Sequence, residues 1–185
     1  MRRMSARWSA TAMLLAVLTL PGVGRANSIA SVTHDGPGCP SGSIRYSISG
    51  DGLNMLLVFD RFIVSTGQGI PLGEGTKDCR IDINMQASDG VRMNMVSLGY
   101  VELDQGIVGE QHQHVPRARR ANQVLTFHGP LEKDYDSGSS AMVPGNDSQA
   151  KIAFSILLKL DLDNSANPAG RGQMAIDSFD FKIVP

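Results

Sequence analysis

Residues 151–163, KIAFSILLKLDLD, decide the fold class, because every even position from Ile152 to Leu162 is apolar. A repeat of two puts these side chains on one face of a β-strand, whereas a helix would scatter them around its axis. The other face carries Ser155 and Lys159. The stretch therefore predicts a long strand with one buried face and one solvated face.

Further runs of the same alternation occur at 44–48, 81–85 and 91–104. Residues 53–59 are apolar on both faces, which predicts a strand that is buried on both sides. Residues 124–128 make a further short strand candidate. No segment longer than about ten residues has the periodicity and the caps of a helix.

Two local signals add detail to these strands. Asp89-Gly90 is a turn dipeptide between two alternating stretches, and it predicts a β-hairpin. After Ile176 the apolar side chains move from even to odd positions, which predicts a β-bulge near Asp177-Ser178.

Connectors rich in Gly, Pro, Ser and Asn occupy 65–78, 129–149 and 163–172. Residues 105–122 are polar and predict a long loop or an irregular hairpin tip. About seven to nine strands joined by turn signals predict an all-β fold. We expect a single antiparallel β-sandwich domain over residues 27–185, with long polar loops.

The first 26 residues have the three parts of a secretory signal peptide. An arginine-rich start precedes the apolar run 10–20, and Gly24-Arg25-Ala26 supplies small residues before a cut after Ala26. The alternative is an uncleaved membrane anchor, but the apolar run is shorter than the roughly 20 residues that span a bilayer. We expect a secreted or periplasmic mature chain without a membrane span.

Charge and composition exclude several classes of protein. The chain has 17 basic and 18 acidic residues, and the predicted signal peptide holds four of the basic ones and no acidic one. The mature chain would therefore carry 13 basic and 18 acidic residues, a formal charge of −5. This balance excludes a polybasic nucleic-acid binder, and a hydrophobic content of 42% excludes disorder over most of the length. The mature chain lacks Trp and has three Tyr, which argues against sugar binding on aromatic platforms and against single-stranded nucleic-acid binding by base stacking.

Both cysteines, Cys39 and Cys79, lie in the mature chain. Export brings the chain into oxidising conditions, so an even pair predicts a disulfide. The alternative is two free thiols, one of them a nucleophile or a metal ligand. No His or Cys lies at ligand spacing from either cysteine.

The histidines are weak candidates for a metal site. His112 and His114 are two residues apart and would share one face of a strand. Zinc needs at least three protein ligands, so His128 or a carboxylate would have to complete the set. Met93 and Met95 have the spacing of a soft-metal pair, but methionines at strand spacing are more often core residues. We expect no metal and no cofactor.

Charged residues supply further candidates. Arg117, Arg119 and Arg120 form a local positive cluster, which is a candidate contact for an anionic partner or a protease-sensitive segment, unless it is simply a solvated loop. Paired carboxylates at 161–163 could do acid–base work, and 78–80 carries an acid and a base. Both pairs alternate with apolar residues, so we expect them on a solvent-facing surface.

A series of motifs, taken in order, resembles a known family. The motifs are GCPSGS at 38–43, LVFDRF at 57–62, GQG at 67–69, KDCRIDIN at 77–84, GYVELDQG at 99–106, FHGP at 127–130, DY at 134–135 and IDSFD at 176–180. Together they resemble the secreted proteins grouped as the domain of unknown function 4360 family, over most of the mature chain.

The resemblance implies a small secreted β-rich domain and brings no activity with it. Many relatives carry a second cysteine pair, after a Trp near the middle of the chain and at the C-terminus. Here those regions read NDSQA at 146–150 and IVP at 183–185, so both later cysteines are absent. Their joint absence implies that Cys39 and Cys79 pair with each other.

No catalytic motif of a serine hydrolase, a zinc protease or a phosphate-binding loop is present. We therefore expect an exported, non-enzymatic, monomeric interaction module that uses the loops 105–122 and 129–149 to bind an unknown extracellular partner other than nucleic acid. The alternative is a secreted metal-dependent or hydrolytic enzyme centred on the histidines at 112–128. Asn146-Asp147-Ser148 is a glycosylation sequon, which has meaning only in a eukaryotic host.

The signal-peptide prediction has a direct test. The intact mass of the secreted protein should equal that of a chain that begins at Asn27. A secreted form that retains the apolar run 10–20 would contradict it.

Overall fold

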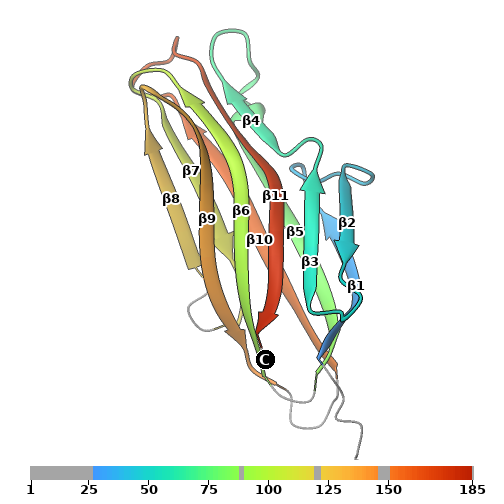
Figure 1. Ribbon diagram of the computed structural model, residues 1–185. Coiled ribbons are helices and arrows are strands. Elements are labelled where there is room, and N and C mark those ends of the chain that lie inside the picture. The colour runs from blue at the N-terminus through green and yellow to red at the C-terminus, as the bar shows by residue number, and fades with distance from the viewer. Residues whose placement is uncertain (1–26, 88–89, 119–121, 146–150, 185) are drawn as a thin grey trace, which may run out of the picture.

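The computed structural model describes residues 27–87, 90–118, 122–145 and 151–184. In these residues two antiparallel sheets lie face to face (Figure 1). Sheet A has the strand order β1-β5-β10-β7-β8, and sheet B has the order β2-β3-β11-β6-β9, with β4 pairing with β11 off this path. The predicted antiparallel β-sandwich is confirmed.

The strands of sheet A are β1 (Ser28–Asp35), β5 (Thr76–Gln86), β7 (Val108–His114), β8 (Asn122–His128) and β10 (Lys151–Asp163). The strands of sheet B are β2 (Ile44–Ile48), β3 (Asn54–Phe59), β4 (Ile63–Thr66), β6 (Val91–Leu103), β9 (Leu131–Val143) and β11 (Gly172–Val184), and a 3₁₀ turn, η1 (Leu72–Gly75), precedes β5. The described residues thus hold eleven strands, more than the seven to nine expected.

The core forms between the inner faces of the two sheets. The even positions of β10 point inward as predicted, and Ile156, Leu158 and Leu160 are fully buried. From sheet B, Phe181 of β11 meets Phe154 of β10, with ring centroids 6.0 Å apart. Each fully buried side chain of this size stabilises the fold by about 1.5–3 kcal/mol.

The predicted hairpin at Asp89-Gly90 is wrong. β5 pairs with β1 and β10 in sheet A, whereas β6 pairs with β9 and β11 in sheet B. Residues 88–89 lie outside the described residues, but the connection that contains them runs from one sheet to the other. Two strands that each have one apolar face show the same alternation whether they are neighbours in one sheet or lie opposite each other across a core. Alternation in the sequence therefore does not distinguish a hairpin from a crossing between sheets.

The prediction that 53–59 is buried on both sides is also wrong. Leu56 of β3 is 38% exposed and Val58 is half-buried. Both side chains point to the outer face of sheet B, over which no described element packs. The apolar run therefore predicts a strand at β3, but it does not show whether one face or both faces of the strand are buried.

Two segments predicted as loops are strands. Within 105–122, β7 lies between β10 and β8, and its inward positions hold Gly109, Gln111 and Gln113 instead of aliphatic residues. Gln113 donates a hydrogen bond to Ser139 Oγ, so the interior between the sheets is polar at this end. Within 129–149, β9 is a 13-residue edge strand rich in Ser and Asp. Neither strand has the apolar alternation that would predict it.

The predicted β-bulge is confirmed, because the register between β11 and β6 shifts between Ile176 and Ser178. Next to it the buried hydroxyl of Tyr135 donates to the carbonyl oxygen of Ala175 at 3.0 Å. A side chain at Gly99 would collide with that carbonyl and with the Tyr135 ring, so this contact requires glycine.

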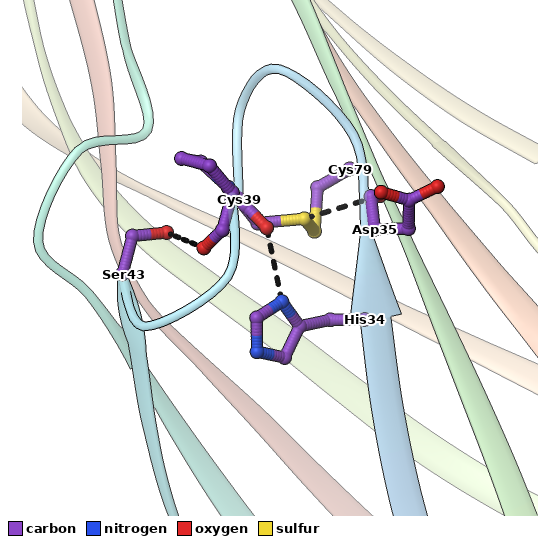
Figure 2. Close-up of a disulfide and its surroundings, with 6 residues drawn as sticks. His34, Asp35, Cys39, Ser43 and Cys79 are labelled. Atoms are coloured by element: carbon purple, nitrogen blue, oxygen red, sulfur yellow. Dashed lines mark hydrogen bonds between the residues drawn. A yellow bond between two sulfur atoms is a disulfide. The ribbon is translucent and has the colours of Figure 1, made fainter.

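Cys39 and Cys79 form a buried disulfide at the edge where the chain first changes sheet (Figure 2). Cys39 lies in the loop that leaves β1 of sheet A for β2 of sheet B, and Cys79 lies on β5. Gly38 N donates to the Asp78 carbonyl at 2.8 Å, and His34 Nδ1 donates to the Cys39 carbonyl at 2.9 Å. The bond and these contacts fix the crossing loop against β5.

The alternation of β10 predicts unequal effects of two substitutions on stability. Phe154→Ala should lower the free energy of unfolding by about 3–5 kcal/mol, because it removes a buried ring from the centre of the sandwich. Lys159→Ala should change it by less than about 0.5 kcal/mol, because Lys159 lies on the outer face and its ion pair, with Asp161, is half-exposed to solvent. Chemical denaturation measures both values, and equal losses would contradict the assigned faces.

The disulfide predicts a redox-dependent melting temperature. The bond joins residues 40 apart in the sequence, and in the chain-entropy model such a closure stabilises the folded state by about 4 kcal/mol. Reduction should lower the melting temperature and leave the far-UV β signal of the folded protein unchanged. Thiol counting on the denatured, unreduced monomer should find none, and two free thiols or a disulfide-linked dimer would overturn the assignment.

Candidate functional site

A groove of about 1150 Å³ lies on the outer face of sheet A. Its floor is formed by outward side chains of β5 and β10, and β1 borders one side. The segment that follows β7, with Pro116 and Arg117, borders the other side, and 143–145 lines part of it as well. The groove therefore lies over the two strands whose other faces form the core.

Because side chains alternate between the two faces of β5, its outward residues form a row of hydrogen-bonding groups along the groove. Inward residues of β5 are buried, so Arg80, Asp82, Asn84 and Gln86 all point outward into the groove. From the first to the last of these is six residue steps, about 20 Å at the rise of an antiparallel strand. The groove thus presents a row of polar side chains of alternating chemistry.

Small side chains on β10 give the groove its depth. Ala153 pairs in register with Asn84, and Ser155 pairs with Asp82. Both β10 residues point outward, and both are short. The floor is therefore lower beside β5 than it would be with the long side chains that usually cover the outer face of a sheet.

The rim next to β10 arises because β7 is shorter than its partner. β7 ends at His114, opposite Leu157, while β10 continues back to Lys151. Beyond this point 115–118 takes the place of a strand, anchored by the fully buried Val115. Arg117 in this segment has a φ of 66°, which is uncommon for a residue with a side chain.

The charged side chains among the described lining residues are mostly basic. They are Arg80, Arg117, Lys151 and one carboxylate, Asp82. Arg80 Nε donates to both oxygens of that carboxylate, at 2.9 and 3.1 Å, and Ser155 Oγ donates to it as well. Partial burial alone would raise the pKa of Asp82, but these hydrogen bonds outweigh it and hold the pKa below its usual value. Asp82 is therefore ionised at neutral pH.

The structure places only part of the predicted arginine cluster. Arg117 lines the groove, while Arg119 and Arg120 lie outside the described residues. Sequence analysis missed Asn84, Lys151 and the rest of the polar lining, because their alternation with core residues is the pattern of any solvated strand face. The small outward residues of β10 were the one signal of a depression in that face.

The three candidate metal-binding histidines do not converge. His112 and His114 share the outer face of β7, but His112 Nε2 donates to Glu110 at 3.0 Å and His114 Nδ1 donates to Asn122. His128 lies at the far end of β8, opposite Val108 and about 14 Å along the strand from His112. In the part of the chain that the structure describes, no three His, Cys, Asp or Glu side chains are grouped to hold a metal.

The other candidates have structural roles. Met93 and Met95 are fully buried in the core. Asp161 pairs with Lys159, and Asp163 accepts a hydrogen bond from the Ser165 amide, which lowers the pKa of Asp163. The glycosylation sequon that begins at Asn146 lies outside the described residues.

A second, smaller cavity of about 480 Å³ lies on the outer face of sheet B. Leu56 and Val96 line it together with Asp180 and Lys182. Ser47, Ser49, Asn54 and Asn94 add polar groups to its lining, but it offers one charge of each sign and has less than half the volume of the groove on sheet A.

The family described as Domain of unknown function (DUF4360) matches residues 25–184. The chain belongs to this family. The resemblance seen in the sequence motifs is therefore confirmed. An uncharacterized secreted protein of Arthroderma benhamiae is 29% identical over 167 residues, which cover 84% of this chain and 68% of that protein.

The Arthroderma benhamiae relative is a secreted protein, in agreement with the predicted export of this chain, and the cleavage point near Ala26 lies outside the described residues and stays a prediction. Among the described residues no helix has the length and hydrophobicity to cross a membrane.

Similarity to solved structures is low. The structure of TmCBM61 in complex with β-1,4-galactotriose aligns over 85% of this chain and 91% of its own, with a TM-score of 0.30 and 8% identity. The enzymatically active domain of tailspike protein 4 of bacteriophage CBA120 aligns over 86% of this chain and 20% of its own, with a TM-score of 0.26 and 6% identity. At these scores neither likeness bears on the ligand of this DUF4360 protein.

Proposed function

We propose that this DUF4360 protein is a non-enzymatic extracellular binding module that holds an extended ligand in the groove on the outer face of sheet A. The observation that carries the proposal is the groove itself, a row of outward polar side chains about 20 Å long above a floor of small residues. A shallow groove of this length suits a chain-like ligand better than a compact small molecule, which pockets usually enclose.

The position of the groove on paired strands favours binding without large rearrangement. β5 pairs with β1 on one side and β10 on the other, and β10 pairs with β5 and β7. Side chains on such strands are held in place by the backbone ladders, so a ligand would find them already positioned. This arrangement supports a recognition surface.

The chemistry of the lining favours binding over catalysis. Among the described lining residues the one carboxylate is Asp82, which is held ionised by Arg80 and Ser155. A general acid needs a raised pKa, and a nucleophilic serine needs an adjacent base such as histidine. The alternative of a histidine-centred enzyme depended on His112, His114 and His128 converging, which they do not.

The proposed binding surface, the outer face of sheet A, differs from the loops expected from the sequence. The expected loops 105–122 and 129–149 are largely the strands β7 and β9. Of these expected loops, the segment around Arg117 and the residues Pro144 and Gly145 remain as described loop contributions to the groove. The face of the sheet supplies the rest.

A substitution that fills the groove tests the proposal. Ala153→Trp should block the groove, because the outward side chain at this position lies on its floor. Ser140→Trp is the matched control, because Ser140 points outward from β9 on sheet B. Against a panel of purified cell-wall and matrix polymers, we expect Ala153→Trp to bind its polymer at least about tenfold more weakly than wild type and Ser140→Trp to bind as wild type.

Both variants should keep the wild-type far-UV spectrum and a cooperative melt, which separates lost binding from lost folding. Equal binding by both tryptophan variants, or no polymer retained by the wild type, would contradict the proposed function.

A further inference from the structure

The basic groups of the groove are widely spaced. Arg80 lies opposite Leu157 on β10, whereas Lys151 lies opposite Gln86 on β5, so the two cations are about six residue steps, or 20 Å, apart along the strands. Arg117 stands on the rim formed by the segment after β7. A ligand that met all three would have to carry negative charges at separated points.

These cations are available to a ligand. Within the described ranges neither Arg117 nor Lys151 forms an ion pair. Arg80 engages Asp82 through Nε alone, which leaves the two terminal nitrogens of its guanidinium as donors. Among its described lining residues the groove carries three cations and one anion, whereas the predicted mature chain has a formal charge of −5, and this local excess of positive charge favours an anionic ligand.

Between the cations the groove offers groups that suit hydroxyls. Asp82 is ionised and accepts hydrogen bonds, while the amides of Asn84 and Gln86 both donate and accept. A chain with negative charge at every position would bring charge against Asp82. A chain whose carboxylates alternate with hydroxyl groups would place hydroxyls there instead.

We infer that the ligand of the groove is an acidic polysaccharide, with sugar carboxylates on Arg117, Lys151 and Arg80 and sugar hydroxyls on Asp82 and Asn84. The inference rests on the proposed binding function of the groove. The aromatic residue of the lining, Phe154, is 8% exposed and packs inward on Phe181, so recognition uses charge and hydrogen bonds instead of ring stacking.

Chemically matched polymers test the inference. The probes are polygalacturonate and alginate, each compared with its methyl ester, which keeps the hydroxyls and removes the charge. We expect the wild-type protein to bind at least one acid form at least about tenfold more tightly than its ester, and binding to weaken as NaCl rises. Poly-L-glutamate, which has carboxylates without hydroxyls, should bind at least about tenfold more weakly than the acidic polysaccharide.

Charge-removing variants connect this binding to the groove. Arg117→Gln and Lys151→Gln should each weaken binding of the acid form by about tenfold, because each removes a charge-assisted contact. Lys159→Gln is the matched control: it removes the same charge from the same outer face outside the groove lining, and its affinity should stay within about twofold of wild type.

The outcomes separate this inference from the proposed function. The acid polymer and its methyl ester could bind equally well, with Ala153→Trp abolishing the binding of both. This result would overturn the inference that the ligand is acidic, and the groove would remain the binding surface. Poly-L-glutamate binding as tightly as the acidic polysaccharide would overturn the polysaccharide class. If neither the charge variants nor Ala153→Trp weakens binding of the acidic polysaccharide, both the proposed function and the acidic-ligand inference are overturned. If neither polygalacturonate nor alginate binds the wild-type protein, the acidic-ligand inference is overturned.

Discussion

The alternation of side chains along β5 and β10 is the constraint on which the structure depends. The two strands pair over their full overlap, from Thr76 opposite Asp161 to Gln86 opposite Lys151. One set of faces buries Ile81, Ile83 and their β10 partners in the core, and the other set forms the floor of the groove. A slip of one residue would exchange the two faces, so the register that stabilises the core also places the polar side chains of the groove.

The positions where the chain changes sheet hold this arrangement together. The β1–β2 loop leaves sheet A beside β5, and the bond from Cys39 to Cys79 fixes it there. Gly36 in this loop has a φ of 127°, and a side chain on it would meet the Asp78 carbonyl at 2.5 Å, so the close approach requires glycine. β5 is thus held by two neighbouring strands and by a covalent bond, and the groove floor inherits that rigidity.

The elements that could be predicted from sequence are those that follow the simple rule of one apolar face. Residues 151–163 and the parity change after Ile176 were sufficient to predict β10 and the bulge in β11. β7 was missed because its inward positions hold Gly109, Gln111 and Gln113 instead of aliphatic residues; Gln113 meets Ser97 and Ser139 of sheet B, a long-range match that no local pattern reveals. β9 was missed because an edge strand rich in Ser and Asp has the composition of a loop.

The pairing of strands and the groove depend on long-range geometry. The sequence between β5 and β6 has the turn signal of a hairpin, and only the packing of the two sheets distinguishes a hairpin from a crossing. Arg117 was a candidate contact from its charge alone, but its neighbours in the groove come from β5 and β10, which are distant in sequence. A site made of ordinary outward residues on several distant segments leaves no recognisable pattern in any one of them.

Amide chemical-shift mapping locates the ligand-binding surface without changing the protein. In a titration of ¹⁵N-labelled mature protein with oligogalacturonate, the perturbed amides should cluster at 80–86 of β5, 151–157 of β10 and 115–118 of the rim. Perturbations concentrated on the outer face of sheet B, around Leu56 and Val96, or around His112 and His114 on β7, would contradict the assignment of the groove as the binding site.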